Sequence, residues 1–225
     1  MRNTFIILTI LACATWLFAQ DAPFAVYQAE PSQETFLAAQ GHFTAQLAEN
    51  EADASARLML GYLHLMELNR TIGWYDEHQD DLKAGQRFGW ANLMLSMGRY
   101  DDALAQYDKL NESKPDWSCP WRHKGEAYYE SGRYAQAATA FEKAIETRIE
   151  HYDAYVWLAR AQHALGEDAT ALATLETGFG YYGKDIEDPD EEVDAVEVKE
   201  FYAMLLEVNG RDEEAAQVRA ELEGN

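Results

Sequence analysis

The sequence has very little cysteine, with two residues, Cys13 and Cys119, in a chain of 225. Cys13 lies in an apolar segment at the start of the chain, so Cys119 would be alone if that segment were removed. A single cysteine cannot form an intramolecular disulfide. The fold must then be stabilised by side-chain packing, without an intramolecular disulfide bond.

Basic residues are also scarce. The chain has 18 Lys+Arg against 40 Asp+Glu, which gives a formal net charge of −22. Nucleic acids and anionic membrane surfaces bind proteins through clustered lysine and arginine. The charge therefore argues against both as partners and suits a basic protein or peptide. The alternative is an acidic surface that keeps the chain soluble and binds no partner.

Motifs for catalysis and metal binding are absent from the sequence. It has no GxSxG, no P-loop, no HExxH and no Cys/His pair at zinc spacing. The acidic run at 76–81 lies near an expected helix end, where charges are normally solvated. The acidic run at 185–194 lacks the mid-loop glycine of an EF-hand. We therefore predict no enzyme activity, no catalytic residues, no metal site and no cofactor.

Residues 1–19 have the pattern of a secretory signal. Arg2 precedes an apolar run from Phe5 to Phe18, and Ala19 offers a small residue at a cleavage point. The run is shorter than the ~20 apolar residues that a membrane span needs. We predict an exported protein, periplasmic or secreted, without a membrane span once the signal has been removed.

A lipid anchor on Cys13 is another possible function of this segment. A lipoprotein normally continues with a polar tether after its acylated cysteine, but residues 14–18 stay apolar. The sequence therefore argues against acylation of Cys13.

The main positive feature is a pattern that recurs about every 34 residues. In residues 118–151 it consists of Trp121, Gly125, Tyr128, Gly132, Tyr134, Ala137, Phe141 and Ala144. This pattern resembles the tetratricopeptide repeat, a helix–turn–helix unit. The resemblance implies an all-α fold, a tetratricopeptide-repeat α-solenoid in which antiparallel helix pairs stack into a right-handed superhelix.

The repeat pattern also predicts how the chain is divided. After the signal at 1–19, we expect an extended lead-in at 20–31 and a half-repeat at 32–53, then repeats at 54–83, 84–117, 118–151 and 152–180, an acidic insert at 181–195 and a terminal repeat at 196–225. The repeat at 54–83 lacks a turn glycine, so we expect Asn69 to end its first helix.

Two positions in each repeat carry small residues, as closely packed helices require. The first set is Gly61, Ala91, Gly125, Ala159 and Ala203, and the second is Gly73, Ala103, Ala137, Ala171 and Ala215. Glycine or alanine at every one of these positions supports the register of the repeats.

The resemblance implies a non-catalytic scaffold for protein–protein interaction. In tetratricopeptide-repeat proteins the stacked first helices usually line a concave groove that holds a peptide or a partner helix. In the present register the groove contacts are Tyr62, Phe88, Asn92, Arg122, Tyr129 and Arg160. Aromatic and arginine side chains are enriched among residues that dominate binding energy. Together with the signal, this predicts a scaffold of the cell envelope.

One subclass of the family holds the C-terminal carboxylate of chaperones, and the sequence departs from it. Asn92 and Arg160 match parts of that pattern. Phe88, however, replaces a basic residue, and Glu126 places a negative charge where a carboxylate would bind. We do not expect this chain to bind such a carboxylate.

Two other functions are compatible with the sequence. One is a small-ligand or transporter-accessory subunit with an apolar pocket around Tyr62, Met66 and Phe88. The other is a self-assembling structural protein that associates through the half-repeat at Phe36–Phe43.

The signal pattern predicts where an export pathway cuts the chain. When the full chain is expressed in a secreting cell, N-terminal sequencing of the exported protein should begin at Gln20. Ala19→Arg should block this cleavage, because the site needs a small residue. Retention of the unprocessed wild-type chain inside the cell would contradict the prediction.

Overall fold

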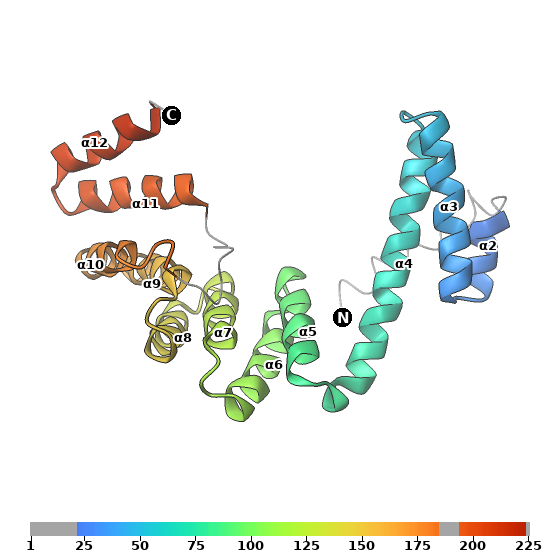
Figure 1. Ribbon diagram of the computed structural model, residues 1–225, viewed down its shortest axis with the longest axis horizontal. Coiled ribbons are helices and arrows are strands. Elements are labelled where there is room, and N and C mark those ends of the chain that lie inside the picture. The colour runs from blue at the N-terminus through green and yellow to red at the C-terminus, as the bar shows by residue number, and fades with distance from the viewer. Residues whose placement is uncertain (1–21, 185–193, 224–225) are drawn as a thin grey trace. The chain divides into compact units, whose positions relative to one another are not determined.

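A computed structural model describes residues 22–184 and 194–223, and all regular structure in these ranges is helical (Figure 1). The signal at 1–19 and most of the insert at 181–195 lie outside the described residues. The all-α prediction is confirmed. None of the described helices is long and apolar enough to cross a membrane.

The chain forms two compact units, residues 1–79 and residues 80–225. In unit 1 the helices are α2 (Ala22–Ala29), α3 (Gln33–Glu49) and α4 (Ala54–His78), after which the short 3-10 helix η1 (Gln79–Asp81) follows. In unit 2 they are α5 (Ala84–Ser96), α6 (Tyr100–Ser113), α7 (Ser118–Glu130), α8 (Tyr134–Thr147), α9 (Tyr152–Ala164), α10 (Asp168–Phe179), α11 (Ala195–Val208) and α12 (Asp212–Glu223). Each unit is described by itself.

Unit 2 is a series of four antiparallel helix pairs. The first helices α5, α7 and α9 begin one repeat length apart, as do the second helices α6, α8 and α10. The turn inside each pair contains a glycine with positive φ: Gly98, Gly132, Gly166 and Gly210, at 71°, 76°, 81° and 74°. A side chain strains this left-handed conformation, so glycine is the residue that reverses the chain at low cost.

The two helices of each pair cross at small buried residues. Ala91, Gly125, Ala159 and Ala203 in the first helices and Ala103, Ala137, Ala171 and Ala215 in the second helices are all buried. The helices approach closely at Gly125, where an added Cβ would lie 2.5 Å from a ring carbon of Phe141. Small residues at these positions therefore let the helices pack.

The lead-in at 20–31 is not extended as predicted, because α2 occupies most of it. Phe24 and Tyr27, three residues apart, share one helix face and are buried. Phe24 packs edge-to-face on Phe43, with ring centroids 6.3 Å apart. The Tyr27 hydroxyl donates a hydrogen bond to Glu67 Oε2 at 2.7 Å. An eight-residue helix is too short to show a clear period in the sequence.

The position of α2 also overturns the predicted route to self-assembly through the half-repeat. Helix α3 begins after Ser32, whose side chain and that of Thr35 form a capping box. Its residues Phe36 and Phe43 pack in the core of unit 1, and Phe43 is fully buried. The apolar face of the half-repeat is therefore covered within the chain.

The predicted helix pair at 54–83 is also wrong, because α4 is a single 25-residue helix that continues through Asn69. Asparagine costs little inside a helix compared with glycine or proline. Neither glycine nor proline occurs between Met66 and Ile72, so nothing there breaks the helix. Gly61 and Gly73 are exposed, and an added Cβ would meet no atom within 4 Å at either position.

Gly125 and Gly61 should respond in opposite ways to replacement by alanine. Gly125→Ala should destabilise unit 2 by about 1–3 kcal/mol, because the new methyl group overlaps Phe141. Gly61→Ala should stabilise α4 by about 0.5–1 kcal/mol, because alanine favours the helix and meets no neighbour. Urea denaturation of the two variants measures both effects. Equal changes in the two variants would contradict the packing described here.

Candidate functional site

The first helices of unit 2 form one connected surface. Helix α7 contacts both α5 and α9, and side chains link α9 to α11. We call this surface the first-helix face and define it by Phe88, Asn92, Glu126, Tyr129, Trp157 and Arg160. It contains four of the six predicted groove residues: Phe88 and Asn92 on α5, Tyr129 on α7 and Arg160 on α9.

Aromatic rings fill the junction between α5 and α7. The Phe88 ring lies 4.8 Å from that of Trp117 and 5.1 Å from that of His123, centroid to centroid. The Tyr107 hydroxyl donates to Asn92 Oδ1 at 2.8 Å. This bond fixes the orientation of the Asn92 amide. In the described part of the chain no hydrogen bond involves its Nδ2 group, which can therefore donate to a bound molecule.

Arg122 differs from its predicted role as an exposed groove contact, because its side chain is only 2% exposed. Its Nη1 donates to Glu126 Oε2 at 3.1 Å, and its Nη2 donates to His123 Nε2 at 2.9 Å. Arginine can only donate, so His123 Nε2 is the acceptor and the imidazole proton lies on Nδ1. That Nδ1 lies 3.2 Å from Glu126 Oε2 and donates to it. Arg122 therefore positions Glu126 from below the surface.

Glu126 is the acidic group of the first-helix face, and its side chain is 24% exposed. Burial tends to raise its pKa, but the hydrogen bond from His123 and the charge of Arg122 outweigh burial and lower it. The side chain is therefore a carboxylate at neutral pH. The hydrogen bonds from Arg122 and His123 both reach Oε2. Among the described residues none donates to Oε1, which can accept from a bound molecule.

A second aromatic group lies where α7 meets α9. Tyr129 packs edge-to-face on Trp157 with centroids 5.4 Å apart, and the Arg160 guanidinium lies 4.9 Å from the Trp157 centroid. Arg160 Nη2 is 3.6 Å from Glu197 Oε2 on α11, too long for a direct hydrogen bond. Burial raises the pKa of Tyr129, so its hydroxyl keeps its proton. The tyrosine and the arginine thus present donors beside an aromatic surface.

Tyr62 lies on α4 of unit 1, whereas the other five predicted residues belong to unit 2. It lines a hollow of about 490 Å³ together with Ala54, Arg57, Leu58, Gly61 and Leu65. All of these residues belong to α4, so the hollow is an open surface rather than an enclosed cavity. It includes neither Met66 nor Phe88, the other residues of the predicted apolar pocket.

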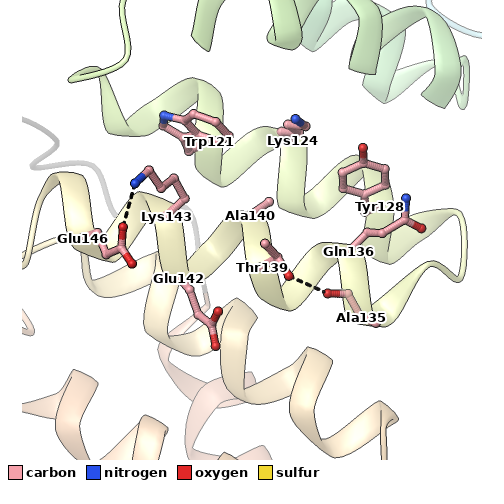
Figure 2. Close-up of a pocket in the computed structure, with 10 residues that line it drawn as sticks. All are labelled: Trp121, Lys124, Tyr128, Ala135, Gln136, Thr139, Ala140, Glu142, Lys143 and Glu146. Carbon is pink, nitrogen blue, oxygen red and sulfur yellow. Dashed lines mark hydrogen bonds and ion pairs between the residues drawn. The ribbon is translucent and has the colours of Figure 1, made fainter. Parts of the chain in front are cut away.

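A further hollow of about 600 Å³ lies between α7 and α8, as Figure 2 shows. Trp121, Lys124 and Tyr128 line it from α7, and none of them belongs to the first-helix face. Its lysines have partners: Lys124 Nζ lies 2.6 Å from an Asp108 carboxylate oxygen, and Lys143 Nζ donates to Glu146 at 2.7 Å. The charges of this hollow are thus largely neutralised within the chain.

His151 supports the junction behind Arg122. It precedes α9, is 2% exposed, and neither ring nitrogen has a hydrogen-bond partner among the described residues. Burial, followed by the charges of Arg148 and Arg122, lowers its pKa to about 2. The imidazole is therefore neutral in the folded protein.

Several residues of the site were missing from the sequence-based set. The rings of His123 and Trp117 pack on Phe88 and so connect α5 to α7. The Arg160 guanidinium lies over the Trp157 ring. Glu197 on α11 lies 3.6 Å from the same guanidinium. The register could have identified Trp157, because it precedes Arg160 by three residues and shares its helix face.

The geometry of unit 2 is that of a helical-repeat array, which can be compared with known proteins. Residues 128–188 match the family model described as tetratricopeptide repeat. The fold is that of a tetratricopeptide-repeat helical solenoid, as predicted.

Two relatives share short segments with this chain. Superkiller protein 3 of Schizosaccharomyces pombe is 26% identical over 113 residues, which cover 48% of this chain and 8% of the relative. The Hsp70-Hsp90 organizing protein of Triticum aestivum is 42% identical over 52 residues, which cover 23% of this chain and 9% of the relative. The chain thus spans less than a tenth of either relative.

Among solved structures, the chain is similar to YrrB, described as a TPR protein with an unusual peptide-binding site. The match has a TM-score of 0.51 and 22% identity, and covers 80% of this chain and 72% of YrrB. A likeness at this identity shows the fold alone.

The buried His151 should make unit 2 less stable in mild acid. Its folded pKa of about 2 lies below the unfolded value of 6.5, so unfolding takes up a proton below pH 6.5. Stability contributed by the neutral ring is present above pH 6.5 and is lost as the pH falls. Between pH 6.5 and 4.5 we expect a loss of about 2–3 kcal/mol.

Chemical denaturation of wild type and His151→Leu over this pH range measures the effect. The variant should show a shallower loss of stability, because leucine cannot take up the proton. Parallel curves for the two proteins would contradict the burial of a neutral imidazole.

Proposed function

We propose that this chain is a non-catalytic scaffold that binds a peptide segment of another protein on the first-helix face. The observation that carries the proposal is the set of unused polar groups on that face. Asn92 Nδ2 can donate, Glu126 Oε1 can accept, and the Arg160 guanidinium makes no direct hydrogen bond to any described residue. All three groups are partly buried and keep hydrogen-bonding capacity that a ligand can use, and Arg160 also lies within ion-pair range of Glu197.

The spacing of these groups suits an extended peptide rather than a compact ligand. They lie on three successive first helices, α5, α7 and α9. A peptide that crosses these helices can exchange main-chain hydrogen bonds with each in turn, while its side chains contact Phe88 and Tyr129. Aromatic and arginine side chains are the types that most often dominate such interfaces.

Charge favours a basic partner. The chain carries a net charge of −22, and Glu126 places a fixed carboxylate on the binding face. A lysine or arginine of the partner can therefore pair with Glu126, while Arg160 donates to main-chain carbonyl oxygens. Long-range attraction would speed the encounter at low salt.

The proposed site of action is the cell envelope or the outside of the cell. Support comes from the signal pattern at 1–19, which precedes α2, the first helix of the described residues. The partner would then be another envelope or secreted protein.

A small-ligand subunit is less well supported by the geometry. Ligand sites usually enclose most of the ligand surface. The apolar hollow on α4 is lined by one helix and stays open, so it offers contact from one side.

Peptide selection tests the proposal directly. Peptides selected from a random displayed library against the full chain should bind with micromolar affinity in calorimetry. Arg160→Gln should weaken the best peptide at least tenfold, about 1.4 kcal/mol, because it removes a hydrogen-bonding cation from the face. Raising the salt concentration should weaken binding of a basic peptide.

Lys143→Gln is the matched control, since it removes one positive charge from the surface of α8 instead. Its affinity should stay within twofold of wild type. Equal affinity of Arg160→Gln and wild type would place the peptide elsewhere. Equal losses in both variants would mean that net charge, not the site, controls binding.

A further inference from the structure

Helix α4 carries a partly exposed apolar stripe, although Tyr62 within it also packs against the core of unit 1. Leu58, Gly61, Tyr62 and Leu65 follow one another at steps of three, one and three residues and share one helix face. Leu58 is 49% exposed and Leu65 36% exposed. The stripe forms the floor of the hollow of about 490 Å³. A soluble surface helix normally turns such a stripe toward another element.

In unit 2 the residues equivalent to Gly61 are covered by a second helix, but α4 has no such partner helix among the described residues. At the positions equivalent to Gly61 in unit 2, the second helix of the same pair covers a small residue: Ala91, Gly125 and Ala159 are all buried. Helix α4 continues straight instead of turning, so no second helix folds back over Gly61. An added Cβ at Gly61 would meet no described atom within 4 Å. A position suited to close helix packing thus faces open space.

The stripe is complementary to itself. A leucine stands at each end of the stripe, three residues from the central pair Gly61 and Tyr62. The stripe therefore reads nearly the same in both chain directions. If a second α4 lies antiparallel across it, a two-fold axis beside Gly61 places Leu58 of each copy against Leu65 of the other. Such a self-matching contact is the requirement of a two-fold interface. Gly61 lets the two helix axes approach closely.

Charge does not obstruct this contact locally. The four stripe residues are uncharged, and Arg57 at the edge of the hollow directs its Nη2 to the Glu51 carbonyl oxygen at 2.8 Å. At longer range two copies repel, since each carries a net charge of −22. Salt screens this repulsion. Association of copies should therefore strengthen with salt.

We propose that a second copy of this chain covers the stripe, forming an antiparallel α4–α4 pair with two-fold symmetry. This contact is separate from the first-helix face, which lies in unit 2. A single helix pair buries less than the ~1,600 Å² of a standard interface, so the dimer should be weak, with a dissociation constant in the micromolar range.

Sedimentation equilibrium of the full chain tests the dimer. The wild-type mass should rise from 25.5 kDa toward twice that value with concentration, and more steeply at high salt. Gly61→Gln should remain a monomer at tenfold higher concentration, because a long polar side chain blocks the crossing. The variant should fold, since a Cβ added at Gly61 meets no described atom within 4 Å.

Gly41→Gln is the matched control. Gly41 lies on α3, is exposed and also has no atom within 4 Å of an added Cβ. It should dimerise like wild type. A wild-type monomer at every concentration would overturn the proposal, and so would a Gly61→Gln variant that dimerises as tightly as wild type.

Cross-linking gives a second, independent measurement. In a chain with Cys13→Ser and Cys119→Ser, Gly61→Cys should form a disulfide-linked dimer under mild oxidation, because the two-fold axis passes beside this residue. Gly41→Cys in the same background should stay monomeric. Equal cross-linking of the two variants would contradict the proposed axis.

Peptide binding to the first-helix face should weaken as salt is added, whereas the dimer should become stronger. A failure of the dimer proposal can therefore be distinguished from a failure of the proposed peptide binding.

Discussion

Close approach of paired helices at small buried residues is the interaction on which unit 2 depends. Each pair needs one such residue in each helix, and a Cβ at Gly125 would already overlap Phe141. This contact fixes how α7 and α8 cross, and so which residues of α7 face outward. The first-helix face is therefore a consequence of core packing, since a shift of one residue would turn its side chains away.

A buried polar group adds a second constraint behind that face. Arg122 and His123 both bond to Glu126 Oε2, so a cation and a neutral imidazole hold one carboxylate in place. Breaking such a group leaves buried atoms without partners, which costs more than the bonds contribute when intact. The network thus favours a single orientation of Glu126. Preorganised groups lose less entropy when a ligand binds.

The fold of unit 2 was predictable from sequence because the residues that form its turns and the residues that pack its helices together recur at the same spacing. Turn glycines such as Gly132 and small residues such as Ala137 recur at one spacing, and each has one structural explanation. Unit 1 was predicted less well, because α4 has no breaking residue and α2 is too short to show a period. The register places Phe88, Asn92, Tyr129 and Arg160 on first helices, where the structure has them, and their contact with a partner stays a prediction. The burial of Arg122 did not, because it depends on contacts with its neighbours that spacing cannot reveal.

The stacking of Arg160 on Trp157 gives the first-helix face an optical property. An indole ring beneath a guanidinium group experiences the field of that charge, and its emission responds when the charge moves. A molecule that draws Arg160 away from Trp157, or shields both from water, changes the local polarity at the ring. The surface proposed to bind partners therefore contains its own fluorophore, and occupancy can be followed without attaching a label.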